Sequence, residues 1–122
     1  MKAKHLQQGE DAELACCRYL KAQGLNLQEK NFRCRHGEID LVMLHNKNLV
    51  FVEVRFRQNP FYGGGLESIT PAKQKKLRKT AEYYLQQNPQ YKNARFDVVA
   101  MSKSSADTGK SHYTYNWIQN AF

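Results

Sequence analysis

The stretch that decides the fold is EIDLVMLHNKNLVFVEVR, residues 38–55. It holds two apolar runs, rich in valine and other strand-forming residues, on either side of the polar segment 45–48. Two such runs separated by a short turn predict antiparallel strands, over Glu38–Leu44 and Leu49–Arg55. The rest of the chain is interpreted around this β-hairpin.

The same hairpin is expected to bring two carboxylates and a guanidinium together. If it closes symmetrically around its turn, Leu44 faces Leu49 and Asp40 falls opposite Glu53, with Cβ atoms about 4.5–5.5 Å apart. Arg55 lies two residues after Glu53 and therefore points to the same face. Opposed carboxylates repel, so the pattern favours either a bound divalent cation or an ion pair with Arg55 that is only structural. With a cation, the cluster would suit phosphoryl transfer.

The chain before the hairpin predicts one helix and one strand. Helical patterning covers Gln8 to Gln23 and stops at Gly24, a residue typical of the position after a helix. A strand then begins at Leu25 and carries on toward Phe32, before a turn that leads into the hairpin.

The chain after the hairpin begins with a predicted loop over Gln58–Gly65. Thr70 and Pro71 then supply an N-cap and a proline at the first helical position, so a second helix is expected to run to about Gln87.

Two further strands complete the predicted fold. One covers Ala94–Met101, and the other carries Tyr113, Tyr115 and Trp117 on one face and ends near Ile118. The segment Ser102–Ser111 between them is polar and is predicted to be a mobile connection. The element order is α-β-β-β-α-β-β, which describes a mixed α/β domain with helices packed on a sheet.

Composition limits the class of protein. The chain has 122 residues, which predicts a single domain over residues 1–122. No apolar run has the length of a transmembrane helix, and no signal-peptide core follows the basic start. Cys16, Cys17 and Cys34 lack the spacing of a disulfide or zinc framework. A cytoplasmic protein with reduced thiols is therefore expected.

The formal net charge of +8 is the first indication of a partner. A basic domain without a membrane segment usually contacts phosphate, most often that of nucleic acid. Basic residues crowd the second predicted helix and flank the hairpin, where phosphate contacts would give affinity without sequence specificity. The alternative is a solvated basic surface. The residues of this predicted nucleic-acid track are Arg33, Arg35, Arg57, Lys73, Lys75, Lys76, Arg78 and Lys79.

Two helical residues add to the candidate site. The apolar stripe of the second helix, which includes Leu77 and Tyr84, extends back to Gln74, whose amide needs partners that an active site could supply. Glu13 shares a side of the first helix with its apolar residues and is either aimed at something positive or turned to solvent. Gln74 is equally compatible with a partly exposed position where the stripe ends.

Several ordered motifs resemble a known family. They are Gly37-Glu38-Ile39-Asp40-Leu41-Val42, Phe51-Val52-Glu53-Val54-Arg55, Ser68-Ile69-Thr70-Pro71-Ala72-Lys73-Gln74-Lys75-Lys76-Leu77, Arg95-Phe96-Asp97-Val98-Val99 and Trp117-Ile118-Gln119-Asn120-Ala121-Phe122. Together they cover nearly the whole chain and resemble the bacterial YraN family. That family is similar to the PD-(D/E)XK nuclease superfamily, which shares a restriction-endonuclease-like fold with archaeal Holliday-junction resolvases.

The resemblance implies a restriction-endonuclease-like fold, with a mixed central β-sheet flanked by two main helices. It also implies a Mg²⁺-dependent phosphodiesterase acting on DNA, with Mn²⁺ as a substitute. Asp40 and Glu53 would be metal ligands, Gln74 matches the glutamine on the helix after the core hairpin, and Glu13 matches the first-helix glutamate. Arg55 stands where the motif of the superfamily has lysine. Arginine stays protonated, so it can hold a phosphate but cannot act as a general base.

Three functional hypotheses follow. The first is a metal-dependent endonuclease that hydrolyses DNA phosphodiester bonds and is either selective for junctions or branches or only weakly specific; a junction resolvase usually works as a two-fold homodimer. The second is a DNA-binding accessory protein of the same fold that cleaves weakly or not at all. The third is a protein-interaction module in which the hairpin residues form only a structural network. Metal-dependent cleavage separates the first from the others, and salt-dependent DNA binding separates the second from the third.

Overall fold

The computed structural model describes residues 4–57, 69–104 and 112–122 of the chain. The elements in these ranges are α1 (Lys4–Ala22), β1 (Asn26–Cys34), β2 (Gly37–His45), β3 (Asn48–Arg57), α2 (Pro71–Gln87), β4 (Asn93–Ser104) and β5 (His112–Ile118). The predicted order α-β-β-β-α-β-β and the mixed α/β class are confirmed.

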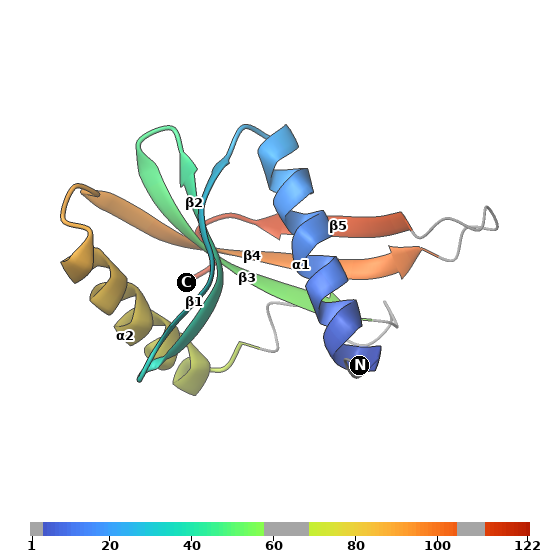
Figure 1. Ribbon diagram of the computed structural model, residues 1–122, viewed down its shortest axis with the longest axis horizontal. Coiled ribbons are helices and arrows are strands. Elements are labelled where there is room, and N and C mark those ends of the chain that lie inside the picture. The colour runs from blue at the N-terminus through green and yellow to red at the C-terminus, as the bar shows by residue number, and fades with distance from the viewer. Residues whose placement is uncertain (1–3, 58–68, 105–111) are drawn as a thin grey trace.

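The strands form one sheet in the order β1-β2-β3-β4-β5 (Figure 1). Neighbouring strands are antiparallel except β3 and β4, which run parallel. The chain passes through α2 between these two strands. Helix α1 packs on one face of the sheet and α2 on the other. A mixed sheet between two helices agrees with the restriction-endonuclease-like fold that the resemblance implies.

Alternation along β3 supplies both cores of the domain. Val50 and Val52 pack in the cluster under α1, whereas Leu49 and Phe51 pack in the cluster under α2. All four side chains are buried. Full burial of such a side chain contributes about 1.5–3 kcal/mol, so the hairpin anchors the hydrophobic interior on both faces of the sheet.

Local sequence signals explain where the elements end. The Thr70 hydroxyl accepts a hydrogen bond from the Lys73 N–H at 3.2 Å, and Pro71 is the first residue of α2. Gly24 follows α1 with a φ of 100°, and Asn46 turns the chain between β2 and β3 with a φ of 59°. Both φ values lie in a region that favours glycine and asparagine. The predicted N-cap, the N-terminal proline and the glycine after the first helix are confirmed.

Strands β2 and β3 pair along only half of their described length. Their register joins residues 41–45 to residues 48–52 and ends at the pair Leu41–Val52. Beyond that pair, β2 continues beside β1, and β3 continues beside β4. The sheet therefore forks at Asp40 and Glu53. Figure 1 shows the β1–β2 hairpin and the β3–β4 pair diverging toward opposite sides of the molecule.

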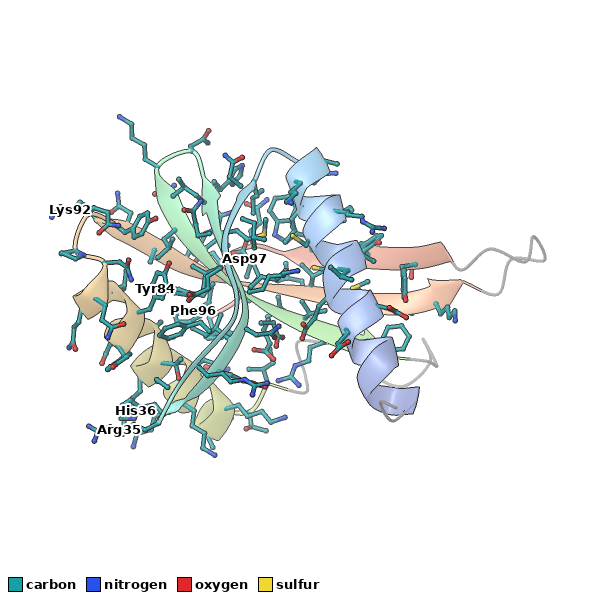
Figure 2. The ribbon with its side chains drawn as sticks, in the orientation of Figure 1. Arg35, His36, Tyr84, Lys92, Phe96 and Asp97 are labelled. Carbon is teal, nitrogen blue, oxygen red and sulfur yellow. The ribbon has the colours of Figure 1, made fainter. Side chains whose placement is uncertain are left out.

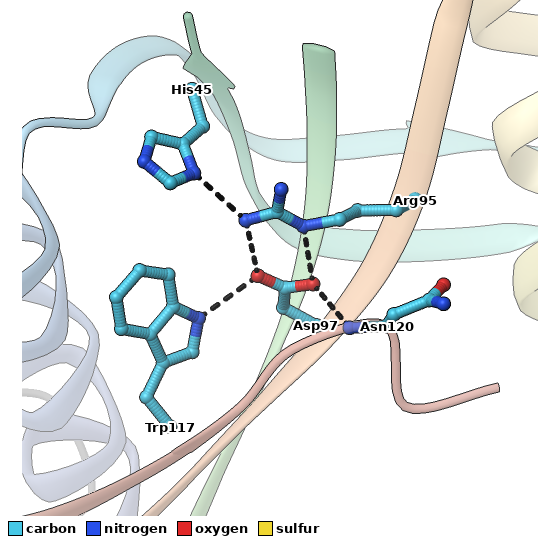
Figure 3. A network of polar contacts seen from close by, with 5 residues as sticks. All are labelled: His45, Arg95, Asp97, Trp117 and Asn120. Carbon is cyan, nitrogen blue, oxygen red and sulfur yellow. Dashed lines mark hydrogen bonds and ion pairs between the residues drawn. The ribbon is translucent and has the colours of Figure 1, made fainter.

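A buried carboxylate holds the C-terminal strands together (Figure 3). Asp97 on β4 is fully buried and accepts hydrogen bonds from Arg95 Nε, Trp117 Nε1 and the Asn120 backbone N–H, each at 2.9 Å. An Arg95 terminal nitrogen lies 3.0 Å from Nδ1 of His45. Because a guanidinium only donates, this histidine nitrogen is the acceptor. The network satisfies a charge that would otherwise be very costly to bury.

Two predicted boundaries change. The first helix begins at Lys4 instead of Gln8. Residues 102–104, predicted as part of a polar connection, instead continue β4 and pair with β5. That prediction was wrong because polar side chains suit a solvent-facing strand pair; here the Ser102 and Thr114 hydroxyls hydrogen-bond each other across the strands. The predicted loop over residues 58–65 and the remainder of the connection, residues 105–111, lie outside the described residues.

The cysteines and the helices bear on the class of protein. Cys16 and Cys17 are buried on α1, Cys34 is half-buried, and all three are free thiols, as predicted. Neither of the two helices in the described ranges is long and apolar enough to cross a membrane.

Candidate functional site

The fork in the sheet brings Asp40 and Glu53 together. The predicted register is confirmed as far as Leu41–Val52, and the carboxyl groups just beyond it are hydrogen-bonded to each other. A second bond fixes Asp40, because its Oδ2 accepts from the Val54 backbone N–H at 2.8 Å. This N–H lies where β3 has parted from β2, so the carboxylate takes the place of the missing strand partner.

Burial disfavours two negative charges on this carboxyl pair. The side chain of Glu53 is only 16% exposed. Burial and the neighbouring charge of Asp40 raise the pKa of Glu53 from 4.5 to about 8. Burial also raises the pKa of Asp40, although the Val54 N–H opposes this effect. Glu53 is therefore largely protonated at neutral pH and donates to the Asp40 carboxylate, and the pair shares one proton.

Glu13 approaches the pair from α1, and Asn31 approaches it from β1. Burial and the charge of Asp40 raise the pKa of Glu13 from 4.5 to about 7. The Asn31 side chain hydrogen-bonds Glu13, and its backbone has a φ of 53°. Asparagine is one of the few residues that adopt this left-handed conformation readily. Asn31 was not among the residues predicted from the sequence; the signal was an asparagine within a strand, where the residue is disfavoured.

Arg55 follows Glu53 on the side of the sheet that faces α2. Its Nη2 lies 3.5 Å from Glu53 Oε1, and its side chain is 22% exposed. Its Nε is buried and, among the described residues, has no hydrogen-bond partner. A buried donor without a partner is costly. The guanidinium therefore has unused capacity to bind an acceptor such as a phosphate oxygen.

A pocket of about 160 Å³ opens between the fork and α2. Its lining comes from three elements: Gly37 and Glu38 of β2, Glu53 and Arg55 of β3, and Lys73, Lys76, Leu77 and Thr80 of α2. Gly37 has a φ of 146°, and a Cβ there would lie 3.2 Å from the Thr80 hydroxyl oxygen. The missing side chain thus lets β2 approach α2 closely and close the pocket at one side. Glu38 was not among the predicted site residues, although its charge acts on all three carboxyl groups described above.

The predicted nucleic-acid residues separate into different environments. Only Lys73 and Lys76 line the pocket among the described basic residues of α2. Lys75 and Lys79 are exposed on the same helix. Arg78 instead lies over the rings of Phe96 and Phe122, 5.7 and 5.6 Å from their centroids, so it packs on the C-terminal end of the chain.

The basic residues around the hairpin are also dispersed. Arg33 is exposed and pairs with Glu38 at 2.9 Å. Arg35 lies with His36 at the tip of the β1–β2 hairpin, as Figure 2 shows. Arg57 ends β3, but its side chain lies outside the described side chains.

Gln74 lies at the first turn of α2. Its Nε2 donates to the Ile69 carbonyl at 3.3 Å, and the residue is half-buried. It is absent from the described lining of the pocket. The structure thus gives this amide a local partner at the helix start, while its predicted role at the site stays a prediction.

The donor chemistry of the site is that of oxygen ligands. Asp40 and Glu53 supply carboxylates, and Glu13 lies nearby. Across the residues that the structure describes, no three His, Cys, Asp or Glu side chains converge closely enough to hold a metal ion by themselves. A cation bound by the pair would therefore complete its coordination with other oxygens, as Mg²⁺ commonly does with water and substrate phosphate.

Comparisons with known proteins give the family. Residues 12–101 match the family described as "Uncharacterised protein family UPF0102". The relatives that carry the name UPF0102 protein include those of three bacteria. That of Nitrosococcus oceani is 45% identical, covering 98% of this chain and 94% of its own length. That of Alcanivorax borkumensis is 43% identical, covering 93% and 90%. That of Methylobacillus flagellatus is 47% identical, covering 95% and 96%.

The matched range contains every residue assigned above to the fork and the pocket. The relatives match nearly the whole chain, as the motif resemblance to the YraN-like family led us to expect. The chain belongs to the UPF0102 family.

Proposed function

We propose that the protein is a metal-dependent endonuclease that hydrolyses DNA phosphodiester bonds. The observation that carries the proposal is the buried pair Asp40–Glu53 at the fork, with Arg55 beside it, whose buried Nε has no partner among the described residues. Two buried carboxyl groups in contact are unfavourable in the absence of a cation. The resemblance to PD-(D/E)XK nucleases supports the same interpretation.

The residues fit a hard divalent cation such as Mg²⁺ or Mn²⁺. Both donors are carboxyl groups, and a cation held by Asp40 and Glu53 would replace their shared proton in neutralising the charge of the pair. The Val54 N–H donates to Asp40 Oδ2 and fixes the orientation of the carboxylate that would hold the cation. A bound Mg²⁺ would supply a water of lowered pKa and stabilise negative charge on the reacting phosphate.

The residues of this chain have distinct roles in the proposed reaction. Arg55 would bind a non-bridging phosphate oxygen and stabilise the charge that builds on it. It cannot remove a proton from water, because its guanidinium stays protonated. Glu13, with a pKa raised to about 7, is matched to accepting a proton at neutral pH. Lys73 and Lys76 would hold the DNA backbone beside the carboxyl pair.

The first test is cleavage of labelled linear, branched and four-way-junction DNA with Mg²⁺, Mn²⁺ or EDTA. Glu53→Gln is the matched variant, because it keeps the shape and hydrogen-bonding capacity of the side chain but cannot ionise. Metal-dependent cleavage that the variant lacks is the expected result. A preference for junctions would extend the proposal to a two-fold dimer, which light scattering would then have to detect. Equal cleavage by wild type and variant would contradict the proposed site.

A second candidate is a DNA-binding accessory protein that does not cleave. Two observations favour it: Arg55 stands where the related nucleases have lysine, and the pair Asp40–Glu53 holds its charge low by sharing a proton. Folded protein that binds DNA with a steep salt dependence but does not cut any substrate with either metal would favour this role.

A further inference from the structure

The pocket between the fork and α2 differs from an open phosphate track. Three cationic side chains converge on it from two elements: Arg55 from β3, and Lys73 and Lys76 from α2. Two acids also line it, Glu38 and Glu53, but Glu38 is paired with Arg33, a cation outside the lining, at 2.9 Å. The pocket is therefore positive, and an anion is the ligand class it favours.

The pocket is small. Its volume is about 160 Å³, whereas pockets for drug-sized molecules span about 300–1,000 Å³. A phosphate group with a few waters fits this space better than a complete nucleotide. Leu77 and Thr80 contribute buried, uncharged wall, and the Thr80 hydroxyl already donates to the Lys76 carbonyl at 2.8 Å. The three cationic side chains are therefore the groups that would bind the anion.

The shape of the pocket favours the end of a strand over its middle. Gly37 approaches Thr80 so closely that a Cβ would lie 3.2 Å from its hydroxyl oxygen, which closes the pocket where β2 meets α2. A continuous polynucleotide cannot pass between β2 and α2 at that point, whereas a terminal phosphate can enter the pocket without passing through it. As a monoester it also carries close to two negative charges and three acceptor oxygens, which suits three converging cations better than the single charge of a diester.

We propose that this pocket binds the terminal phosphate monoester of a nucleic-acid strand, an inference that rests on the proposed nucleic-acid function and adds a substrate class to it. Glu53 and Arg55 belong both to the pocket and to the fork. A strand anchored there by its end presents its neighbouring phosphodiester to Asp40 and Glu53. The protein then distinguishes phosphorylated from unphosphorylated ends, and acts near them.

The test compares DNA strands of identical sequence with a phosphate or a hydroxyl at one end, each labelled at the other end. Affinity is measured by fluorescence anisotropy with the full chain in EDTA, so that no cleavage occurs. Strands with the phosphate at the 5′ end and at the 3′ end are tested separately. We expect wild type to bind one phosphorylated strand about tenfold more tightly than its hydroxyl counterpart, the gain of one extra charge-assisted contact.

Two double variants of α2 show which lysines are responsible for the preference for the phosphorylated strand. Lys73→Gln with Lys76→Gln removes the cations that line the pocket, and the ratio of the two affinities should fall to about one. Lys75→Gln with Lys79→Gln removes the same charge from exposed positions on the same helix. It should weaken binding of both strands equally and leave the ratio intact. All four positions are exposed, and glutamine keeps a helix propensity close to that of lysine, so the variants are expected to fold.

The outcomes separate this inference from the proposed nuclease. Equal affinities for phosphorylated and hydroxyl strands in wild type, or a ratio that survives in the Lys73/Lys76 variant, overturn the terminal-phosphate site even if metal-dependent cleavage is found. A ratio that only the Lys73/Lys76 variant loses supports the site even if no DNA is cut. Competition by inorganic phosphate, stronger for the phosphorylated strand than for the hydroxyl strand, is the further expected result.

Discussion

The carboxylate of Asp40 accepts a hydrogen bond from the backbone N–H of Val54 at 2.8 Å, across the point where β2 and β3 separate. This contact lies just beyond the last pair of β2 and β3 and fixes a carboxyl group there. It takes the place of the next backbone pair and holds the carboxyl group at the fork, where strand alternation directs Glu53 and Arg55 toward α2. The separation of β2 from β3 thus places the carboxyl pair beside the guanidinium.

The pH dependence of stability tests the shared proton. The folded pKa of Glu53 is about 8 against an ordinary value of 4.5. Between these values the folded protein holds a proton that the unfolded chain releases, so the free energy of unfolding falls as pH rises. Glu53→Gln cannot ionise and escapes this loss. We expect the variant to exceed wild type by on the order of 4 kcal/mol at pH 8, measured by urea unfolding, with the advantage shrinking toward acidic pH. The exposed Glu82→Gln is the control, and a pH-independent advantage for Glu53→Gln would contradict the shared proton.

Binding of a divalent cation can be tested without any assay of activity. Mn²⁺ should raise the melting temperature of the wild type, and more at pH 8 than at pH 6, because the cation has to displace the proton between Asp40 and Glu53. Asp40→Asn should lose the shift. Thermal unfolding over a series of Mn²⁺ concentrations measures it. The same shift in the wild type and in Asp40→Asn would place the bound cation elsewhere.

Two glycines with unusual backbones provide a matched pair of substitutions. Gly24 has a φ of 100° and open space around its missing side chain, whereas Gly37 has a φ of 146° and lies against Thr80. Gly24→Ala should cost only backbone strain, about 1 kcal/mol. Gly37→Ala adds the close contact and should cost more, about 2 kcal/mol or above. Urea unfolding gives both values. Equal losses would mean that α2 moves away from β2 freely.

The conformation and the side chain of Asn31 can be tested separately. Asn31→Gly retains access to the φ of 53° but loses the hydrogen bond to Glu13. Since that bond lowers the pKa of Glu13, the glycine variant should titrate Glu13 above about 7, as followed by carboxyl NMR. Asn31→Ala loses the same bond and also strains the backbone, so it should be less stable than Asn31→Gly by about 1 kcal/mol. An unchanged Glu13 titration in both variants would exclude a positioning role for Asn31.

Asp97 and Arg33 allow a comparison of ion pairs that differ in burial. Arg95–Asp97 and Arg33–Glu38 have the same separation, 2.9 Å, but Asp97 is fully buried while Arg33 is 75% exposed. Asp97→Asn leaves Arg95 without its counter-charge and should cost about 3–5 kcal/mol. Arg33→Gln should change the unfolding free energy by less than about 1 kcal/mol. Unfolding followed by Trp117 fluorescence measures both, and a cost below about 1 kcal/mol for Asp97→Asn would contradict the structural role of the network.

The hairpin shows how far sequence reasoning reaches. Its strands, its turn and the pairing of Leu44 with Leu49 followed from alternation and turn residues, and the structure confirms them. The capped start of α2 followed from Thr70 and Pro71 in the same way. These features depend on neighbours in the chain, which a sequence displays directly.

The fork and its supporting residues could not be predicted in that way. The hydrogen bond from the Val54 N–H to Asp40 forms because β2 stays paired with β1 while β3 stays paired with β4. Strand β4 is distant from β3 in sequence, so neighbours in the chain do not reveal where β2 and β3 separate. The approach of Lys73 and Lys76 to Glu53 likewise depends on how α2 lies across the sheet. Alternation gives the face of a side chain, but not the place where the sheet divides.

The order of the strands has a consequence for how the chain assembles. Asp40 and Glu53 lie in one hairpin, so their contact is local, whereas the parallel pairing of β3 with β4 must wait for the chain to return through α2. Local pairs form before distant ones. The acidic residues therefore meet while water still surrounds them and weakens their repulsion. The free-energy cost of burying the two acids together arises later, when the helices dock on the sheet. The hairpin can therefore adopt its register before the repulsion between the acids becomes strong.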